Sequence, residues 1–183
     1  MYDVTIVGTG VIGTFIAREL ARYDLKILLL DKENDISAGT TKANTAIIHA
    51  GFDAKENSKM SHFNVQGNAM FDKVCEELDV PFERIGSLVV AFTSEDMKTI
   101  EELYNRGLKA GVPDMEILTS EQIKEMEPNL SNEIKGALYA KTAGVIGPWE
   151  LAIALAENAL ENDVELKLNT EVLDIIKKDD SYR

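Results

Sequence analysis

The chain opens on a short apolar segment that runs into a glycine-rich turn. Residues Tyr2 to Val7 are rich in β-branched side chains and predict a buried parallel strand, which leads into the turn Gly8 to Gly13. A second apolar run, Leu25 to Leu30, is too short for a typical helix and ends at Asp31. Between the two runs lies a stripe at helical spacing, formed by Phe15, Ile16, Ala17, Leu20 and Ala21. The pattern predicts a unit of strand, turn, helix, strand and acid, which is typical of dinucleotide binding.

Each position of the turn has a physical role in this prediction. Gly8 permits the sharp turn, Gly10 lets a diphosphate approach the backbone, and Gly13 lets the helix pack closely on the strand. The backbone N–H groups at the start of the helix, which begins around Val11 and Ile12, attract the diphosphate together with the positive end of the helix dipole. We therefore expect this turn to bind the diphosphate of an adenine coenzyme.

Asp31 closes the second strand, where its carboxylate can accept hydrogen bonds from an adenosine ribose. A 2′-phosphate would meet a negative charge there, so an NADP-type ligand is disfavoured. Glycines also serve ordinary turns, and it is the strand before, the helix after and the acid at this distance that make the signal strong. The unit does not separate FAD from NAD, because both present adenosine diphosphate to the same turn.

The middle of the chain mixes helices and strands. Residues 57–78 predict an amphipathic helix, and residues 82–92 predict one or two strands before a helix that opens at Ser94. Thr119 and Gln122 fit a capping box for a short helix, and residues 134–140 predict a strand. The apolar face of the helix predicted over residues 57–78 is expected to comprise Phe63, Met70, Phe71, Val74 and Leu78. Such a block does not continue a parallel sheet, so we expect an insertion.

From Gly144 onward the pattern returns to that of the first unit. The pair Gly147-Pro148 predicts a helix start with proline at its first position. The segments Val164 to Leu168 and Val172 to Ile176 predict two further strands. We expect both strands to rejoin the first sheet.

Composition excludes several classes of partner. The 183 residues carry a formal net charge of −13, so the surface as a whole repels phosphate backbones and anionic lipid, and nucleic acid is an unlikely general partner. The single cysteine, Cys75, cannot form an internal disulfide or a thiolate metal cage. No apolar run approaches about 18 residues and the first residues lack a positively charged segment, so we expect a cytoplasmic protein without an integral membrane segment.

A polar loop of small residues and hydroxyls follows the first unit, where a simple NAD domain would continue with regular strand and helix units. The loop runs from Ser37 to Thr45 and leads into Ile48-His49-Ala50-Gly51. Together with Gly8 to Gly13, Asp31 and the later segment Arg84 to Val90, these motifs resemble the FAD-dependent oxidoreductases of the D-amino acid oxidase superfamily. The most similar branch contains glycerol-3-phosphate dehydrogenases, glycerophosphate oxidases and L-2-hydroxyglutarate oxidases. Members usually carry a glutamate at the position of Asp31, a longer acid.

The resemblance implies an α/β fold with a Rossmann-like FAD-binding domain of the glutathione-reductase type. It implies an incomplete FAD-binding domain over residues 1–79 and 144–183, and an inserted α+β part of the substrate domain over 80–143 that roofs the substrate site. Family members are far longer, so the chain is expected to be an N-terminal fragment with weak or absent turnover. The residues expected to bind FAD are Gly8, Gly10, Val11, Ile12, Gly13, Asp31, Lys32, Thr40, Thr41, Asn44, Thr45 and Val172.

His49 is the sharpest catalytic candidate. Oxidation of a secondary alcohol by hydride transfer to flavin needs a base for the hydroxyl proton, and a neutral imidazole with an ordinary pKa of about 6.5 can act near pH 7. The resemblance places this histidine beside the flavin and implies glycerol 3-phosphate or a 2-hydroxy acid as substrate. A histidine packed and hydrogen-bonded for structure is the competing interpretation. Two histidines without matching carboxylate spacing give no credible metal site.

Two alternative functions stay open from the sequence. One is an amine or amino-acid oxidase of the same superfamily, which needs no base for an already neutral amine. The other is a flavin-binding subunit without turnover that serves an electron-transfer partner subunit. Neither Arg84 nor Lys141 can be assigned to a substrate phosphate from spacing alone.

Overall fold

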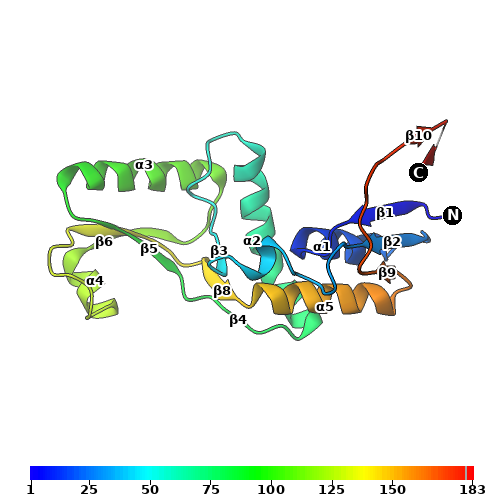
Figure 1. Ribbon diagram of the computed structural model, residues 1–183. Helices are drawn as coiled ribbons and strands as arrows, with labels where there is room; N and C mark the ends of the chain where they lie inside the picture. The colour runs from blue at the N-terminus through cyan, green and yellow to red at the C-terminus, as the bar shows by residue number, and fades with distance from the viewer. Residues whose placement is uncertain (180) are drawn as a thin grey trace. The chain divides into compact units, whose positions relative to one another are not determined.

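A computed structural model describes residues 1–179 and 181–183 and divides the chain into two compact units (Figure 1). Unit 1 comprises Met1–Ala46, Glu77–Val80 and Gly147–Arg183, and unit 2 comprises Ile47–Glu76 and Pro81–Ile146. The domain boundaries expected from the sequence, at 79/80 and 143/144, stay a prediction about the whole protein. Each unit has its own sheet and its own apolar core.

Unit 1 is built on a parallel sheet with the strand order β1-β2-β9. Strand β1 (Val4–Val7) pairs with β2 (Ile27–Leu30), which pairs in turn with β9 (Glu165–Lys167). All four residues of β2 are buried, because this central strand is covered as well as paired on both edges. The predicted strands in the first unit and at residues 164–168 are thereby confirmed.

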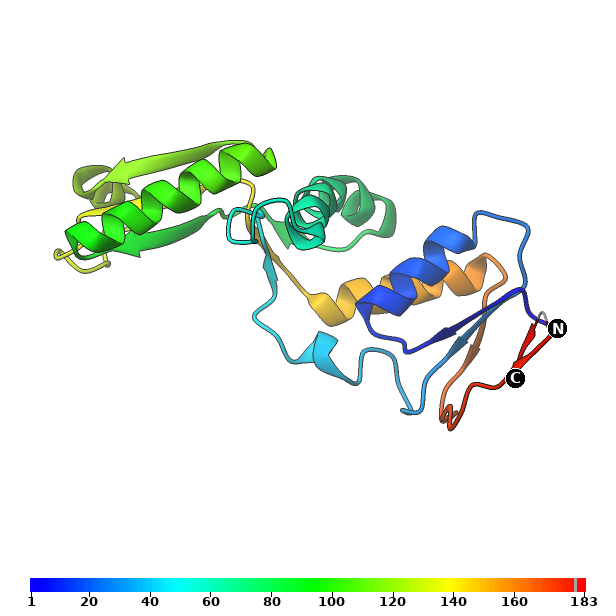
Figure 2. The same ribbon diagram turned by 90° about the horizontal axis from the view of Figure 1, so that it is seen from above.

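Two helices pack against each other beside this sheet, as Figure 2 shows from above. Helix α1 (Val11–Leu20) follows the glycine turn, and α5 (Pro148–Glu161) begins with proline at its first position, as predicted. Small side chains at the contact allow a close approach of the two backbones. The fully buried alanines are Ala17 on α1 and Ala152, Ala156 and Ala159 on α5.

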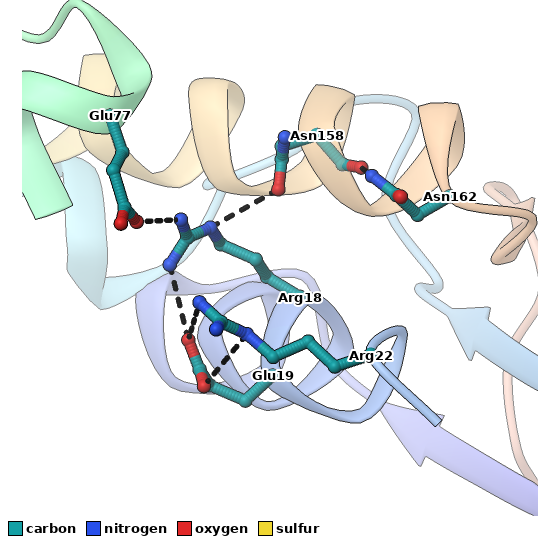
Figure 3. A network of polar contacts seen from close by, with 6 residues as sticks. All are labelled: Arg18, Glu19, Arg22, Glu77, Asn158 and Asn162. Carbon is teal, nitrogen blue, oxygen red and sulfur yellow. Dashed lines mark hydrogen bonds and ion pairs between the residues drawn. The ribbon is translucent and has the colours of Figure 1, made fainter. Parts of the chain in front are cut away.

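A buried arginine adds a polar link between these helices, drawn in Figure 3. Arg18 of α1 is 7% exposed and donates through Nε to Asn158 of α5 at 3.1 Å. Its guanidinium also forms ion pairs with Glu19 at 3.1 Å and with Glu77 at 2.5 Å. A buried charge is costly without partners, and here two carboxylates neutralise it while the bond to Asn158 links α1 to α5.

Unit 2 contains an antiparallel sheet with β7 (Gly136–Ala140) between β5 (Ser87–Ala91) and β6 (Met115–Thr119). Helix α3 (Ser94–Ala110) packs on it, with Ile100 in the shared core, and α4 (Ser120–Met126) follows β6. The predicted capping box is confirmed, because Thr119 Oγ1 accepts from the Gln122 N–H while the Gln122 side chain accepts from the Thr119 N–H. Strand β6 was not predicted from the sequence.

A second, smaller antiparallel sheet in unit 2 has the order β3-β8-β4. Its strands are β3 (Ile47–Ile48), β8 (Gly144–Ile146) and β4 (Phe82–Glu83). The long helix α2 (Lys59–Leu78) confirms the predicted helix, but the predicted apolar face is only partly right, since Val74 is buried and Phe71 and Leu78 are half-buried. Phe63 and Met70 are exposed, whereas the buried residues of the helix are Ser61, Asn68, Val74 and Cys75. Asn68 is among the buried residues, and its side chain donates to two backbone carbonyls, those of His49 and Thr142.

The predicted strand at Val172 to Ile176 is also wrong. Residues 172–176 lie in no helix or strand, and Leu173 and Ile175 are exposed. An apolar run forms a strand only where a neighbour supplies the ladder of hydrogen bonds, and the backbone of Ile176 pairs instead with that of Arg183. This pairing extends a small antiparallel hairpin of β10 (Lys177–Lys178) and β11 (Ser181–Tyr182).

The close approach of α1 to the end of β1 predicts that Gly13 tolerates no side chain. A Cβ at Gly13 would lie 1.9 Å from the carbonyl oxygen of Gly8, which is backbone and cannot swing away. We expect Gly13→Ala to lower the free energy of unfolding by about 3 kcal/mol in urea denaturation followed by circular dichroism.

Gly67, in the interior of α2, is the matched control because a Cβ there has nothing within 4 Å. Gly67→Ala should raise the free energy of unfolding by about 0.5–1 kcal/mol, since glycine is the poorer helix former. Equal effects of the two substitutions would contradict the steric argument.

Candidate functional site

The glycine turn in unit 1 has the geometry that dinucleotide binding requires. Gly8 has φ +107°, a left-handed conformation that side chains rarely adopt, and it turns the chain directly after β1. Gly10 is the N-cap residue of α1, and no side-chain hydrogen bond caps the start of this helix. A Cβ at Gly10 would meet only the Thr41 hydroxyl, at 3.1 Å. A phosphate group can therefore come close to this backbone.

The N-terminus of α1 is partly satisfied from within the chain. The first N–H groups of a helix have no partner inside it, and that of Val11 donates to Thr41 Oγ1 at 3.1 Å. Thr41 belongs to the short 3-10 helix η1 (Thr40–Lys42) and is buried, whereas Ile12 is 75% exposed. Because the Thr41 oxygen accepts from Val11, its own hydroxyl proton stays available for an anion at the same place. These residues fit a diphosphate group.

Asp31 contacts the glycine turn directly. Its Oδ2 accepts from the Thr9 N–H at 2.7 Å and from the Thr9 hydroxyl at 2.6 Å, and its Oδ1 accepts from the Glu33 N–H at 3.0 Å. Partial burial raises the pKa of the Asp31 carboxyl, but hydrogen bonds from the Thr9 side chain and from the N–H groups of Glu33 and Thr9 outweigh it and hold the pKa below its ordinary value. The carboxylate is therefore ionised and oriented at neutral pH.

Thr9 is the residue of this site that sequence reasoning missed. It is fully buried and lies between Gly8 and Gly10. The sequence signal that could have found it is that the two predicted strands end at Val7 and Leu30. The structure pairs these two residues in parallel strands. Thr9 and Asp31 follow these paired residues, so they lie at the same edge of the sheet.

The other expected cofactor residues in unit 1 differ in how far they are engaged. The Asn44 side chain is used within its own loop, donating to the Thr41 carbonyl at 2.6 Å and accepting from the Ala46 N–H at 2.7 Å. Lys32, Thr40 and Thr45 are exposed. Val172 is half-buried, two residues after Thr170, whose N–H donates to the Asp31 carbonyl at 2.8 Å. This contact brings the segment that carries Val172 to the end of β2.

In unit 2, His49 follows β3 directly. Its side chain is exposed, although its neighbours Ile48 and Ala50 are 3% and 2% exposed. Among the residues that the structure describes, the imidazole makes no hydrogen bond and no ion pair. His49 is therefore not a packed and hydrogen-bonded core histidine.

Two cations considered for a substrate phosphate are engaged within unit 2. Arg84 pairs with Asp72 at 2.6 Å, and Lys141 pairs with Glu116 at 2.5 Å. The hydrogen bond to Glu116 raises the pKa of Lys141, and the hydrogen bond from Arg84 lowers the pKa of Asp72.

Cys75 is buried, and desolvation raises the pKa of its thiol.

In residues 1–179 and 181–183, no group of three or more histidine, cysteine, aspartate or glutamate side chains is placed to hold a metal ion. Across the same residues, every helix is too short or too polar to span a bilayer.

Comparison with known proteins decides the family. A model of the family described as FAD dependent oxidoreductase matches residues 3–182. The chain belongs to the FAD-dependent oxidoreductase family. The resemblance drawn from the glycine turn, the hydroxyl-rich loop and the His-Ala-Gly segment is confirmed, and so are the expected fold class and FAD as the cofactor of the family.

The relatives match nearly the whole of this chain, whereas the chain spans less than half the length of each relative named below. Glycerol 3-phosphate dehydrogenase of Caloramator mitchellensis is 58% identical over all 183 residues, which span 38% of that relative. Mitochondrial L-2-hydroxyglutarate dehydrogenase of Dictyostelium discoideum is 32% identical over 92% of this chain and 40% of its own length. The FAD-bound L-alpha-glycerophosphate oxidase of Mycoplasma pneumoniae superposes with a TM-score of 0.93 at 32% identity, covering 99% of this chain and 48% of that one.

The bonds between Thr9 and Asp31 predict a pH-dependent contribution to stability. Thr9→Val keeps the side-chain volume but removes the hydroxyl donor to an ionised carboxylate, so we expect a loss of about 1.5–3 kcal/mol in the free energy of unfolding at pH 7. Because the folded-state pKa of Asp31 is lowered, this stabilisation is present above the ordinary pKa of about 3.9 and is lost as the pH falls through the folded-state value.

Urea unfolding at a series of pH values between 7 and 3 measures this difference. Thr5→Val, at an exposed position of β1, is the control and should change little at any pH. A loss for Thr9→Val that stayed constant down to pH 3 would show that the Asp31 carboxylate is not the partner that matters.

Proposed function

We propose that this chain forms part of a flavoenzyme that oxidises the secondary alcohol of glycerol 3-phosphate, with FAD as hydride acceptor. The observation that carries the proposal is the 58% identity with a glycerol 3-phosphate dehydrogenase along the whole chain. Another relative is named L-2-hydroxyglutarate dehydrogenase, and L-2-hydroxyglutarate is also a secondary alcohol. The same proposed chemistry therefore extends to 2-hydroxy acids. A cytoplasmic location and an electron-transfer partner subunit are further predictions of this proposal.

In this proposal, unit 1 binds the adenosine diphosphate part of FAD. The N–H groups at the start of α1 and the Thr41 hydroxyl hold the diphosphate at Gly10, where no side chain intervenes. Asp31 accepts from the ribose hydroxyls through the acceptor capacity that Thr9 and Glu33 leave unused. The negative charge of Asp31 selects against a 2′-phosphate.

The proton of the substrate hydroxyl goes to His49 in this proposal. FAD, when bound, accepts the hydride from the carbon that bears the hydroxyl group. As the carbonyl group forms, one imidazole nitrogen of His49 takes the hydroxyl proton. The exposed ring with no hydrogen-bond partner among the described residues supports this role, since a base needs a free nitrogen that substrate can reach.

Replacing His49 in a chimera tests this function. The 183 residues replace the matching segment of the Caloramator mitchellensis glycerol 3-phosphate dehydrogenase, which supplies the remaining length. We expect the chimera to bind FAD, seen by flavin absorbance, and to oxidise glycerol 3-phosphate. His49→Gln should reduce kcat by about 10²- to 10⁴-fold, the range of general base catalysis, with flavin absorbance unchanged.

His62→Gln is the matched control, because His62 is the other histidine of the chain and contacts Phe63 at the surface of α2. This variant should keep the activity of the chimera. A chimera with full flavin absorbance that oxidised a neutral amine and not glycerol 3-phosphate would favour the amine-oxidase alternative. Full activity of His49→Gln would remove the base from the proposal.

A further inference from the structure

The orientation of His49 depends on its main chain, because its ring has no partner of its own among the described residues. The side chain is exposed, whereas the residues on either side are buried. Gly51 lies two residues further on with φ +107°, and a Cβ there would be 3.0 Å from Val65 Cγ2 on α2. The segment His49–Gly51 is thus held against α2 by its backbone, with the imidazole left free.

Asn68 of α2 makes the polar contact with this segment. Its side chain is 7% exposed, and its Nδ2 donates at 2.9 Å to the carbonyl of His49 and at 2.9 Å to the carbonyl of Thr142. Both donors of the amide are therefore used. One side chain ties the end of β3 to the turn before β8, two segments far apart in the sequence.

Arg84 sets the orientation of the Asn68 amide. Its Nη1 donates to Asn68 Oδ1 at 3.0 Å, and its Nη2 donates to the Asn68 backbone carbonyl at 2.8 Å. A guanidinium can only donate, so the amide oxygen must face Arg84 and the amide nitrogen must face the two carbonyls. Arg84 is held in turn by Asp72 at 2.6 Å and by the Thr142 carbonyl.

We propose that Asn68, oriented by Arg84, is a positioning residue that fixes the main chain, and with it the Cα–Cβ direction, at His49. The proposal rests on the function proposed above, in which His49 is the base. The half-buried Arg84 and the buried amide of Asn68, which lies in the middle of α2, are both costly to desolvate. Apolar side chains would fill the same space at a lower cost in desolvation free energy. One of their contacts reaches the backbone carbonyl of the candidate base and two reach the Thr142 carbonyl, so the cluster ties the main chain at His49 to a distant turn.

The test uses substitutions that keep the shape of the cluster. Asn68→Asp is isosteric and keeps an acceptor for Arg84, but its carboxylate cannot donate to the carbonyls of His49 and Thr142. Arg84→Lys keeps the charge and loses the fork of donors that orients the amide. Arg106→Lys is the control, because Arg106 donates at 3.1 Å to the Asp53 carbonyl in the same unit and not to Asn68 or the His49 carbonyl.

The first readout is the NMR signal of the His49 imidazole in the 183-residue chain, without cofactor. The chain has two histidines, so the His62 signal serves as an internal reference and His49→Gln assigns the pair. We expect Asn68→Asp and Arg84→Lys to shift or broaden the His49 signal and to leave the His62 signal in place. Arg106→Lys should change neither signal.

The second readout is the kinetics of the chimera. Because a misplacement of about 1 Å can cost about 10²-fold, we expect kcat for Asn68→Asp to fall about 10²-fold while KM changes by less than about threefold. A folded Asn68→Asp or Arg84→Lys variant with the wild-type His49 signal and wild-type kcat would overturn the positioning role. If His49→Gln were fully active while the signal still moved in the Asn68→Asp variant, the base role would fail and the positioning of the segment would stand.

Discussion

The contact between Gly8 and Gly13 is the constraint on which unit 1 depends. The carbonyl oxygen of Gly8 lies where a Cβ of residue 13 would be, so the first turn of α1 sits directly on the end of β1. This approach directs the N-terminus of α1 toward the place where β1 and β2 end. Thr9 lies between Gly8 and Gly10, is fully buried, and donates its hydroxyl hydrogen bond to Asp31. The proposed diphosphate site and the acid proposed to bind the ribose are therefore in direct contact through Thr9.

Most elements of unit 1 could be predicted from the sequence because local chemistry specifies them. Gly8 needs its positive φ, Pro148 starts a helix, and β2 is apolar throughout because it is the central parallel strand. The capping box at Thr119 in unit 2 is equally local. The strand expected at 172–176 failed because pairing depends on a neighbour that the sequence of that segment does not contain.

The contacts around the candidate base could not be predicted for the same reason. Apolar periodicity assigned Phe63 and Met70 to the buried face of α2, yet the helix buries Asn68 because two carbonyls from distant segments need its amide protons. His49 could be proposed from its motif, and the structure adds that its ring has no hydrogen-bond partner among the described residues while its carbonyl accepts from Asn68. A long-range polar cluster of this kind leaves no periodic trace in the sequence.

The proposed function requires that the tip of α1 bind the diphosphate of an adenine coenzyme with Asp31 at the ribose. Calorimetric titration of the chain with ADP-ribose and with its 2′-phosphorylated form tests it most directly, with Gly10→Val as the blocked variant. We expect saturable binding of ADP-ribose, affinity at least about tenfold lower for the 2′-phosphate, and no binding by folded Gly10→Val. Equal affinity for both nucleotides, or binding that survives the side chain at position 10, would contradict it.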